Sequence, residues 1–264
     1  MLVLILDTET SSQYTEKGNL DAAASEVIEI AALLYDNESK VIISKHCSLF
    51  KPQNWSKESE KIHRIPETLV TKHGMAITIP CSDDVREYVY DAIGMTSADV
   101  LMAYNASFDK NVLVKYFPEM AQIPWICAMR DLPHEDFLNK KLKDKKLMMV
   151  SLEYGIIIDP RNLHRALGDC ELTYHIAKNY DIKEILEERE NDKRKYVDLV
   201  TDPGPYNETR NEKMKEIGFR FQFQPKKHWR KSRVPEDEIE DLKKKAFEIY
   251  DGWDFKTEDY EQEY

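Results

Sequence analysis

The apolar positions in the N-terminal part of the chain form short continuous runs that predict buried strands. Residues 2–7 (LVLILD) and 99–104 (DVLMAY) are mainly apolar, which is typical of strands covered on both faces. Residues 27–36 and 40–50 predict two further strands, and the three residues between them favour an antiparallel hairpin. Residues 125–129 (WICAM) also have the character of a strand.

Helical spacing of apolar residues occurs between these strands. Residues 84–93 place their apolar side chains on one side of a helix, and a second helix is expected to begin near Ser107. Further helices are expected at residues 151–156 and 163–180. Strands and helices in this mixed order predict an α/β layer fold with a mixed sheet.

We expect residues 1–182 to form the main domain and three further segments to follow it. Residues 183–203 are highly charged and predict a connector that ends in turn-forming residues. Residues 204–250 predict a small basic α+β module, in which a β-hairpin follows one helix and precedes another. Residues 251–264 carry six acids against Lys256 alone, which predicts a mobile acidic tail.

Composition narrows the class of protein. Of the 264 residues, 42% are hydrophobic and 33% charged, as in ordinary soluble globular proteins. No apolar run approaches the roughly 20 residues that span a membrane, and the N-terminal run lacks the basic start of a signal peptide. We therefore expect a cytoplasmic protein without a membrane partner. The four cysteines lie far apart, which excludes the familiar zinc spacings and a disulfide framework.

Net charge adds a further restriction. The formal charge of −11 at pH 7 argues against a protein that coats nucleic acid nonspecifically. It leaves room for a local basic groove, or for an acidic site that metal ions neutralise. The charge is unevenly spread, because residues 217–235 contain no acid.

Two carboxylates stand at the end of the first predicted strand. Asp7 and Glu9 are two residues apart, so their side chains point to the same face of a strand. At the end of a buried strand, two like charges are costly unless a cation lies between them, and carboxylate oxygens suit Mg²⁺ or Mn²⁺. The alternative is that the strand turns into solvent there and both acids are ordinary loop residues.

Two later segments offer similar residues. Asp109 falls in the first turn of the helix near Ser107, where the helix dipole alone would favour an acid. His164 precedes Asp169 by five residues, which places the two side chains about 140° apart on a regular helix. They serve one site only if His164 lies in the loop before the helix and Asp169 in its early turns. The alternative is a helix cap followed by a surface turn.

Three segments carry these residues, in the order LDTET, AYNASFD and LHRALGDC. They resemble the three motifs of the DEDDh 3′→5′ exonucleases, which are ribonuclease H-like nucleases. The segments VIEIAALLYD, IHRI and WICAMR are similar to intervening parts of that family, so the resemblance covers about residues 1–180. It implies a ribonuclease H-like α/β fold with a mixed five-stranded sheet flanked by helices.

The resemblance also implies a reaction. It assigns four ligands to two divalent metals, Mg²⁺ or Mn²⁺, of which the first would bridge the pair: Asp7, Glu9, Asp109 and Asp169. His164 would be the general base that takes a proton from the attacking water. The implied product is a nucleoside 5′-monophosphate released from a 3′ end.

The same resemblance assigns five residues to the substrate: Thr10, Ser11, His63, Asn105 and Phe108. Thr10 and Ser11 would hold the terminal nucleotide, although many relatives have a glycine in place of Ser11. His63 matches a position that faces the substrate, but Arg64 replaces the glycine that follows it in the family. A histidine at the edge of the core is the other interpretation. Asn105 and Phe108 would shape the site.

The basic module offers a second nucleic-acid surface. Residues 206–234 resemble a small module found on phage and bacterial DNA-processing enzymes. Its candidate contacts combine cations for phosphates with an aromatic ring: Lys226, Lys227, Trp229 and Arg230. The alternative is a hairpin whose aromatic side chains pack on its own helix, with a solvated basic face. The lysine-rich residues 139–149 leave a similar choice, between a track for a single strand and a solvated loop.

Together these patterns favour a metal-dependent 3′→5′ exonuclease that acts on DNA and prefers single-stranded 3′ ends. A polymerase or another DNA-processing protein is the expected further partner. The motifs do not distinguish the sugar, so a 3′→5′ exoribonuclease of the ribonuclease T type is the alternative within the class. A non-catalytic, polymerase-associated nucleic-acid-binding protein is the alternative outside it, which the presence of all four acids and the histidine disfavours.

Overall fold

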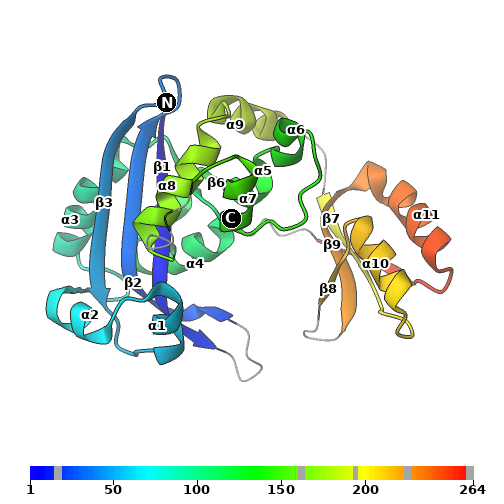
Figure 1. The fold of residues 1–264 in the computed structure, drawn as a ribbon, viewed down its shortest axis with the longest axis horizontal. Helices are drawn as coiled ribbons and strands as arrows, with labels where there is room; N and C mark the ends of the chain where they lie inside the picture. The colour runs from blue at the N-terminus through cyan, green and yellow to red at the C-terminus, as the bar shows by residue number, and fades with distance from the viewer. Residues whose placement is uncertain (15–19, 158, 160–163, 193–195, 223–226, 260–264) are drawn as a thin grey trace. The chain divides into compact units, whose positions relative to one another are not determined.

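The computed structural model describes residues 1–14, 20–157, 159, 164–192, 196–222 and 227–259 (Figure 1). The chain divides into two compact units, Met1–Glu188 and Arg189–Glu263. Each unit is built on a sheet of its own, and the two are described separately.

A mixed sheet forms the centre of the first unit. Its strands are β1 (Leu2–Tyr14), β2 (Leu20–Asp36), β3 (Ile42–Lys51), β4 (Met75–Ala76), β5 (Val100–Ala103) and β6 (Trp125–Cys127). They lie in the order β4-β3-β2-β1-β5-β6, with β1–β2 and β2–β3 antiparallel and the other pairs parallel. The predicted fold class is confirmed. The described sheet has six strands rather than five because it includes β4, whose two residues leave no apolar pattern in the sequence.

Helices cover both faces of this sheet. They are α1 (Lys57–His63), α2 (Glu67–His73), α3 (Asp83–Ile93), α4 (Ala106–Tyr116), α5 (Ala128–Asp131), α6 (His134–Leu138), α7 (Leu147–Glu153), α8 (Ala166–Ala177) and α9 (Ile182–Asn191). Two 3₁₀ turns, Met95–Ser97 and Pro118–Gln122, complete the described connections. The helix expected at residues 151–156 begins earlier and ends before Gly155, whose φ of +70° is left-handed.

The side chains of β1 alternate between two hydrophobic layers. Val3 and Ile5 pack on one face with residues of α7 and α8, including Cys170. Leu4 and Leu6 pack on the opposite face with residues of α3 and α4. Figure 1 shows α8 lying along β1 and β2. A strand covered on both faces has no polar side in its buried part, which accounts for the continuous apolar run at residues 2–6.

The second unit is an antiparallel sheet packed against two α-helices. Its strands are β7 (Tyr196–Thr201), β8 (Arg220–Gln222), β9 (His228–Pro235) and β10 (Phe255–Asp259), in the order β10-β7-β9-β8. Its helices are α10 (Glu208–Glu216) and α11 (Ile239–Ile249), with a 3₁₀ turn at Glu236–Glu238. Its buried core includes Leu199, Phe219, Trp229, Leu242 and Trp253.

The second unit begins earlier and ends later than the charge pattern indicated. β7 lies in the expected connector, and β10 lies in the expected acidic tail and pairs with β7 along its length. Phe255 of β10 packs against the core, and its neighbour Glu258 pairs with Arg230 on β9 at 3.5 Å. The acids of this edge strand are therefore partly matched by cations in the same sheet, which net charge along the sequence does not reveal.

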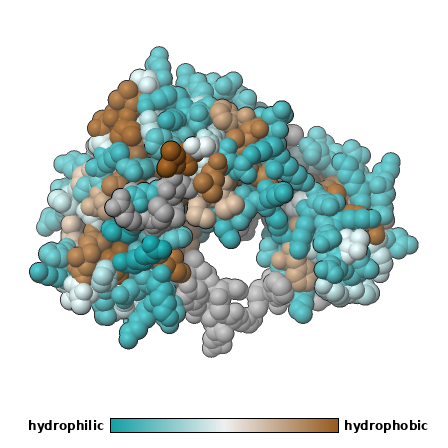
Figure 2. All heavy atoms as spheres, in the orientation of Figure 1, coloured by the Kyte–Doolittle hydropathy of each residue, from teal (hydrophilic) through white to brown (hydrophobic). Residues whose placement is uncertain are grey.

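Two global expectations concern the membrane and the cysteines. A helix with the length and apolar character needed to span a bilayer is absent from the described part of the chain. Figure 2 shows a mainly hydrophilic face on which hydrophobic residues are scattered. All four cysteines are free, with Cys47 exposed and the other three buried, as their spacing predicted.

Candidate active site

Asp7 and Glu9 stand where the sheet opens. The parallel ladder between β1 and β5 ends at Ile5, whereas the antiparallel ladder with β2 continues past Glu9. Because side chains alternate along a strand, Asp7 and Glu9 share the face of Val3 and Ile5, which is the face toward α8. Both residues are half-buried, so they are not loop acids that turn into solvent.

The start of α8 brings Asp169 and His164 to the same place. Asp169 lies in the first turn of the helix, and its carboxylate has an oxygen within 4.8 Å of oxygens of Asp7 and Glu9. His164 is exposed and directly precedes the N-cap residue Arg165. The backbone N–H of His164 donates to the carboxylate of Asp169. The arrangement that the five-residue spacing requires is therefore present, with the histidine before the helix and the acid inside it.

Asp109 joins the group from α4, on the other side of β1. It lies in the first turn of that helix and is buried. Its Oδ1 accepts hydrogen bonds from the backbone N–H of Thr8 at 3.0 Å and from the Thr8 hydroxyl at 2.8 Å. Thr8 lies between Asp7 and Glu9, so these two bonds fix Asp109 beside them. We call Asp7, Glu9, Asp109 and Asp169 the carboxylate cluster.

Burial raises the pKa of each member of the carboxylate cluster, and like-charge repulsion adds to the effect at Asp7, Glu9 and Asp109. Burial, followed by the charges of Asp109 and Asp169, holds the pKa of Asp7 well above its usual range. Burial and then the charge of Asp169 raise the pKa of Glu9 to about 8. Burial raises the pKa of Asp109 and of Asp169 to about 7, although the donors of Thr8 and His164, respectively, act in the opposite direction.

The carboxylate cluster fits a hard divalent cation. Oxygens of three carboxylates, Asp7, Glu9 and Asp169, lie close enough to ligate one ion, and oxygen donors of this type suit Mg²⁺ or Mn²⁺. A cation among them would remove the like-charge repulsion that raises their pKa values. Buried acids of one sign without a matching cation are costly, which makes a metal site a better explanation than a structural role.

One buried acid near the carboxylate cluster was not identified from the sequence. Glu29 on β2 lies directly opposite Glu9 on β1 and is fully buried. Its carboxylate accepts hydrogen bonds from the guanidinium of Arg165 and from the backbone N–H of Ala166. The signal in the sequence is a single acid inside the apolar run VIEIAALLYD. Only the strand register places that acid next to Glu9.

The two predicted contacts after Glu9 are buried. Thr10 is 4% exposed, and Ser11 is fully buried. The Ser11 hydroxyl donates to the backbone oxygen of Asn54. The contacts of Thr10 and Ser11 with a terminal nucleotide stay predictions.

His63 lies at the end of α1 and is 1% exposed. Its Nδ1 accepts a hydrogen bond from the backbone N–H of Ile65 at 3.0 Å, and its Nε2 has no hydrogen-bond partner among the described residues. Trp55 packs against the ring edge-on, with the centroids 6.1 Å apart. The burial agrees with a histidine at the edge of the core. The next residue, Arg64, has φ of +59°, a left-handed conformation that favours glycine.

Asn105 and Phe108 flank the carboxylate cluster at the start of α4. Asn105 is the N-cap residue and is exposed, and its Oδ1 accepts a hydrogen bond from the Ser107 hydroxyl at 3.2 Å. Phe108 is half-buried against the core. Both are one turn or less from Asp109, which is the placement that the resemblance implied. Their contact with a substrate stays a prediction.

In the basic module, the predicted contacts are placed differently. Trp229 is 1% exposed and packs edge-on against Phe221, with the ring centroids 5.0 Å apart, so it belongs to the core of the second unit. Arg230 donates to Asp198 and also pairs with Glu258. Lys227 is exposed, and Lys226 lies outside the described residues. The packed hairpin is therefore the correct alternative for Trp229, because its partners on β8 cover the indole.

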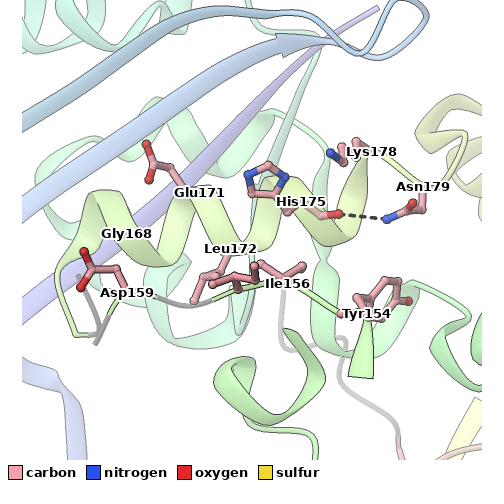
Figure 3. A pocket seen from close by; sticks show the side chains of 11 residues that line it. Tyr154, Ile156, Asp159, Gly168, Glu171, Leu172, His175, Lys178 and Asn179 are labelled. Carbon is pink, nitrogen blue, oxygen red and sulfur yellow. Dashed lines mark hydrogen bonds between the residues drawn. The ribbon is translucent and has the colours of Figure 1, made fainter. Parts of the chain in front are cut away.

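A cavity of about 550 Å³ lies along the outer side of α8 (Figure 3). Gly168, Glu171, Leu172 and His175 line it from α8, and residues 154–157 with Asp159 line it from the segment that precedes this helix. Figure 3 shows Glu171 and His175 on one side of the helix and Leu172 on the other. None of the carboxylate cluster lines this cavity, so it is distinct from the candidate metal site.

Comparison with known proteins gives the family. A model of the RNase T family, described as an exonuclease, matches residues 4–177. The PolC-type DNA polymerase III of Clostridium perfringens (strain 13 / Type A) is 29% identical over 126 residues, which are 48% of this chain and only 8% of that protein.

Solved structures agree on the fold. The nuclease domain of 3′hExo, a DEDDh family member bound to rAMP, has a TM-score of 0.51 at 17% identity, over 71% of this chain and 92% of that one. Escherichia coli exonuclease I in complex with a dT13 oligonucleotide has a TM-score of 0.54 at 15% identity, over 77% of this chain and 48% of that one.

The family match spans nearly the whole first unit. It includes all members of the carboxylate cluster and His164, and it ends inside α8. The second unit lies outside it. The chain therefore belongs to the RNase T family of exonucleases.

Proposed function

We propose that this protein removes nucleotides one at a time from single-stranded DNA 3′ ends and releases nucleoside 5′-monophosphates. The observation that supports this most is the convergence of the carboxylate cluster, drawn from β1, α4 and α8, beside an exposed histidine. The cluster would hold two divalent ions, Mg²⁺ or Mn²⁺, with Asp7 in a bridging position. Bound there, such ions would stabilise negative charge on the phosphate under attack.

His164 is proposed as the general base. Its side chain is exposed, whereas the carboxylate of Asp169 receives the backbone N–H of the same residue. The backbone of His164 is thereby tied to a proposed metal ligand while its imidazole stays open to water. A neutral imidazole in this place would take the proton from the attacking water as the new P–O bond forms. The left-handed φ of +57° at a non-glycine residue is the kind of strain that persists at functional sites.

DNA is the proposed substrate because the curated relative is named as a DNA polymerase. The same relative supports a polymerase as a partner of this chain. RNA is the second candidate, since the 3′hExo structure holds rAMP. The chemistry acts on the phosphate in either case, so the sugar preference has to come from contacts outside the carboxylate cluster.

A lysine-rich segment, Lys140–Lys146, supports a single strand as substrate. The Tyr104 hydroxyl donates to the backbone oxygen of Lys145 at 2.5 Å. Tyr104 directly precedes Asn105, which is the N-cap residue of α4. Lys145 therefore lies near the start of α4, the helix that carries Asp109 of the carboxylate cluster. Lys143 and Lys145 are exposed there, and a flexible strand leaving the site would meet their charges.

The direct test is digestion of single-stranded DNA and RNA of the same sequence, labelled at the 5′ end or at the 3′ end, with Mg²⁺ or Mn²⁺. The proposal expects a 5′-labelled DNA to shorten in a ladder and a 3′-labelled DNA to release labelled mononucleotide at once. Faster loss of RNA than of DNA would favour the second candidate. Internal cuts as the first products, or no digestion of either polymer, would overturn the proposal.

A variant pair makes this test specific to the site. Asp7→Ala removes the proposed bridging ligand and should abolish digestion. Asp83→Asn removes an acid that is 79% exposed on α3 and should leave the rate unchanged. Equal rates for the two variants would show that the observed digestion comes from a contaminant or from another site.

A further inference from the structure

Glu29 is a fully buried acid to which the proposed reaction gives no task. It occupies the strand position opposite Glu9, on the face of β2 that α8 covers. An ionised carboxylate in such a place is retained only when donors surround it. Here both oxygens are used: Oε1 accepts from Arg165 Nη2 at 2.5 Å, and Oε2 accepts from Arg165 Nε at 3.2 Å and from Ala166 N at 2.9 Å.

These donors belong to the start of α8. Arg165 is the N-cap residue of that helix, and its own side chain makes no capping hydrogen bond. Ala166 has one of the first backbone N–H groups of the helix, which have no acceptor within the helix itself. Glu29 supplies that acceptor from another strand, and a carboxylate is favourable at a helix N-terminus. The start of α8 is therefore capped by β2.

The capped residues lie between the two functional groups that α8 provides. His164 comes immediately before Arg165, and Asp169 comes one turn after it. Glu29 lies opposite Glu9, so the pair connects β2, the strand next to the one that carries Asp7 and Glu9, to the segment that carries Asp169 and the imidazole. A guanidinium that donates from both Nε and Nη2 restricts position and orientation more than a single contact does.

We propose that Glu29 and Arg165 are a positioning pair, which sets where His164 and Asp169 stand relative to Asp7 and Glu9. Neither residue touches the substrate in this proposal. It rests on the proposed nuclease reaction for its kinetic consequence, but its structural part is independent of it. Glu29 adds to the like-charge repulsion on Asp7 and Glu9, and the guanidinium of Arg165 acts in the opposite direction on Glu9.

The main test is Arg165→Ala. Loss of the pair should lower kcat about 10- to 100-fold, since misplaced catalytic groups and lost supporting contacts have effects of this size, and KM should change less than about twofold. Because the Arg165 side chain is 41% exposed, guanidinium ion has access to the vacated place beside Glu29. Millimolar guanidinium chloride should restore part of the rate, and the same concentration of potassium chloride should not.

A second variant covers the possibility that Arg165→Ala does not fold. Glu29→Gln keeps the shape of the side chain and an acceptor for Ala166 but removes the charge. It should lower kcat about 10-fold, and guanidinium should have no effect on it. The double variant should be no slower than the slower single variant, because both substitutions break one interaction.

Lys45→Ala is the matched control. Lys45 on β3 pairs with Glu171 on α8 at 2.6 Å, so this pair also ties α8 to the sheet, but its side chains are 40% and 36% exposed. Exposed pairs contribute little, so kcat should stay within about twofold of the wild type. If Lys45→Ala slows the enzyme as much as Arg165→Ala does, the effect is general loosening of α8 and the proposal is wrong.

Hydrogen exchange separates failure of this proposal from failure of the proposed function. Amide exchange in residues 166–169 should be faster in Arg165→Ala and Glu29→Gln than in the wild type and unchanged in Lys45→Ala, whatever the enzyme cleaves. Unchanged exchange in the first two variants, or a kcat equal to that of the wild type, would overturn the positioning role. A wild type that digests no nucleic acid, with the expected exchange pattern, would reject the nuclease reaction and keep the pair.

Discussion

Buried carboxylates are treated in opposite ways in the two units. In the first unit, Asp7, Glu9 and Asp169 place oxygens within 4.8 Å of one another. Burial raises the pKa of all three, and like-charge repulsion raises those of Asp7 and Glu9 further. In the second unit, the side chain of Asp198 is 6% exposed and is paired with the guanidinium of Arg230. One arrangement gathers a single charge sign, whereas the other cancels charge within the fold.

The difference identifies which unit is built for a ligand. In a buried ion pair such as Asp198–Arg230, the two charges neutralise each other, so the pair requires no ligand from outside the chain. The carboxylate cluster is complete only with a cation, and the folded state is less stable without one. The same principle separates Glu29 from Glu9, its neighbour across the strands. Arg165 forms an ion pair with Glu29, whereas its effect on the pKa of Glu9 is smaller than the combined effects of burial and the surrounding carboxylates.

The largest effect should follow removal of one member of the cluster. Asp7→Asn keeps the size of the side chain and removes a charge, so we expect digestion to fall by about 10³-fold or more. The metal-free variant should also be more stable than the wild type, since a repelling buried acid is gone. Kinetics with Mn²⁺ and thermal unfolding with EDTA measure the two outcomes. A variant that is less active and also less stable without metal would show that Asp7 is structural.

A smaller loss is expected for His164→Ala. A general base contributes about 10²-fold or more to such a reaction, and the imidazole is exposed, so the fold should be unaffected. The variant should bind Mn²⁺ as tightly as the wild type, because the cluster keeps all its oxygens. Calorimetric titration with Mn²⁺ alongside steady-state kinetics gives both results. Weaker Mn²⁺ binding would instead make His164 a ligand.

Stability of the metal-free protein should decrease as pH rises. Asp109 and Asp169 have pKa values of about 7 against an ordinary 3.8, and Glu9 has about 8 against 4.5, so the folded state keeps protons that the unfolded chain has lost. The contribution of these three acids to the free energy of unfolding is therefore greatest below about pH 4. It decreases as the pH rises and is lost above about pH 8.

The slope should be about 1.4 kcal/mol per pH unit for each acid that stays protonated in the folded state. Urea unfolding with EDTA between about pH 5 and about pH 9 measures this slope, because that interval includes the pKa values of Asp109, Asp169 and Glu9 in the folded state. Saturating Mn²⁺ should reverse the trend, because the metal binds the ionised acids. A metal-free stability that rises with pH would mean that the cluster acids are already matched by cations.

The residues of the carboxylate cluster were predictable because each stands at a boundary between elements. Asp7 follows a buried run, Asp109 follows another, and His164 and Asp169 bracket a helix start. Motif order then joins three distant segments. Glu29 has no such signal: its contact with Arg165 spans 136 residues and depends on the register of β1 with β2.

The strands of the second unit were harder to predict because charged residues interrupt their apolar pattern. β10 ends in two consecutive acids, Glu258 and Asp259, and Phe255, which packs against the core, is its single aromatic residue. Trp229 lies among cations, which is equally typical of a binding surface and of a hairpin core. Pairing with Thr201 on β7, which is distant in sequence, and with Phe221 across the β8–β9 pair decides it. Long-range pairing, rather than local composition, separates the two interpretations.

The smallest effect on activity should come from the second unit's own buried acid. Asp198→Asn leaves Arg230 with Glu258 at 3.5 Å and removes the buried charge, so we expect a loss of about 1–2 kcal/mol in the free energy of unfolding of that unit. The rate of digestion of a short oligonucleotide should stay within about twofold of the wild type, because Asp198 has no part in the carboxylate cluster. Urea unfolding followed by the fluorescence of the tryptophans, two of which lie in this unit's core, measures the first outcome. If Asp198→Asn stabilised the metal-free protein, as Asp7→Asn is expected to do, Asp198 would also be an unmatched acid, and the contrast between the two units would be lost.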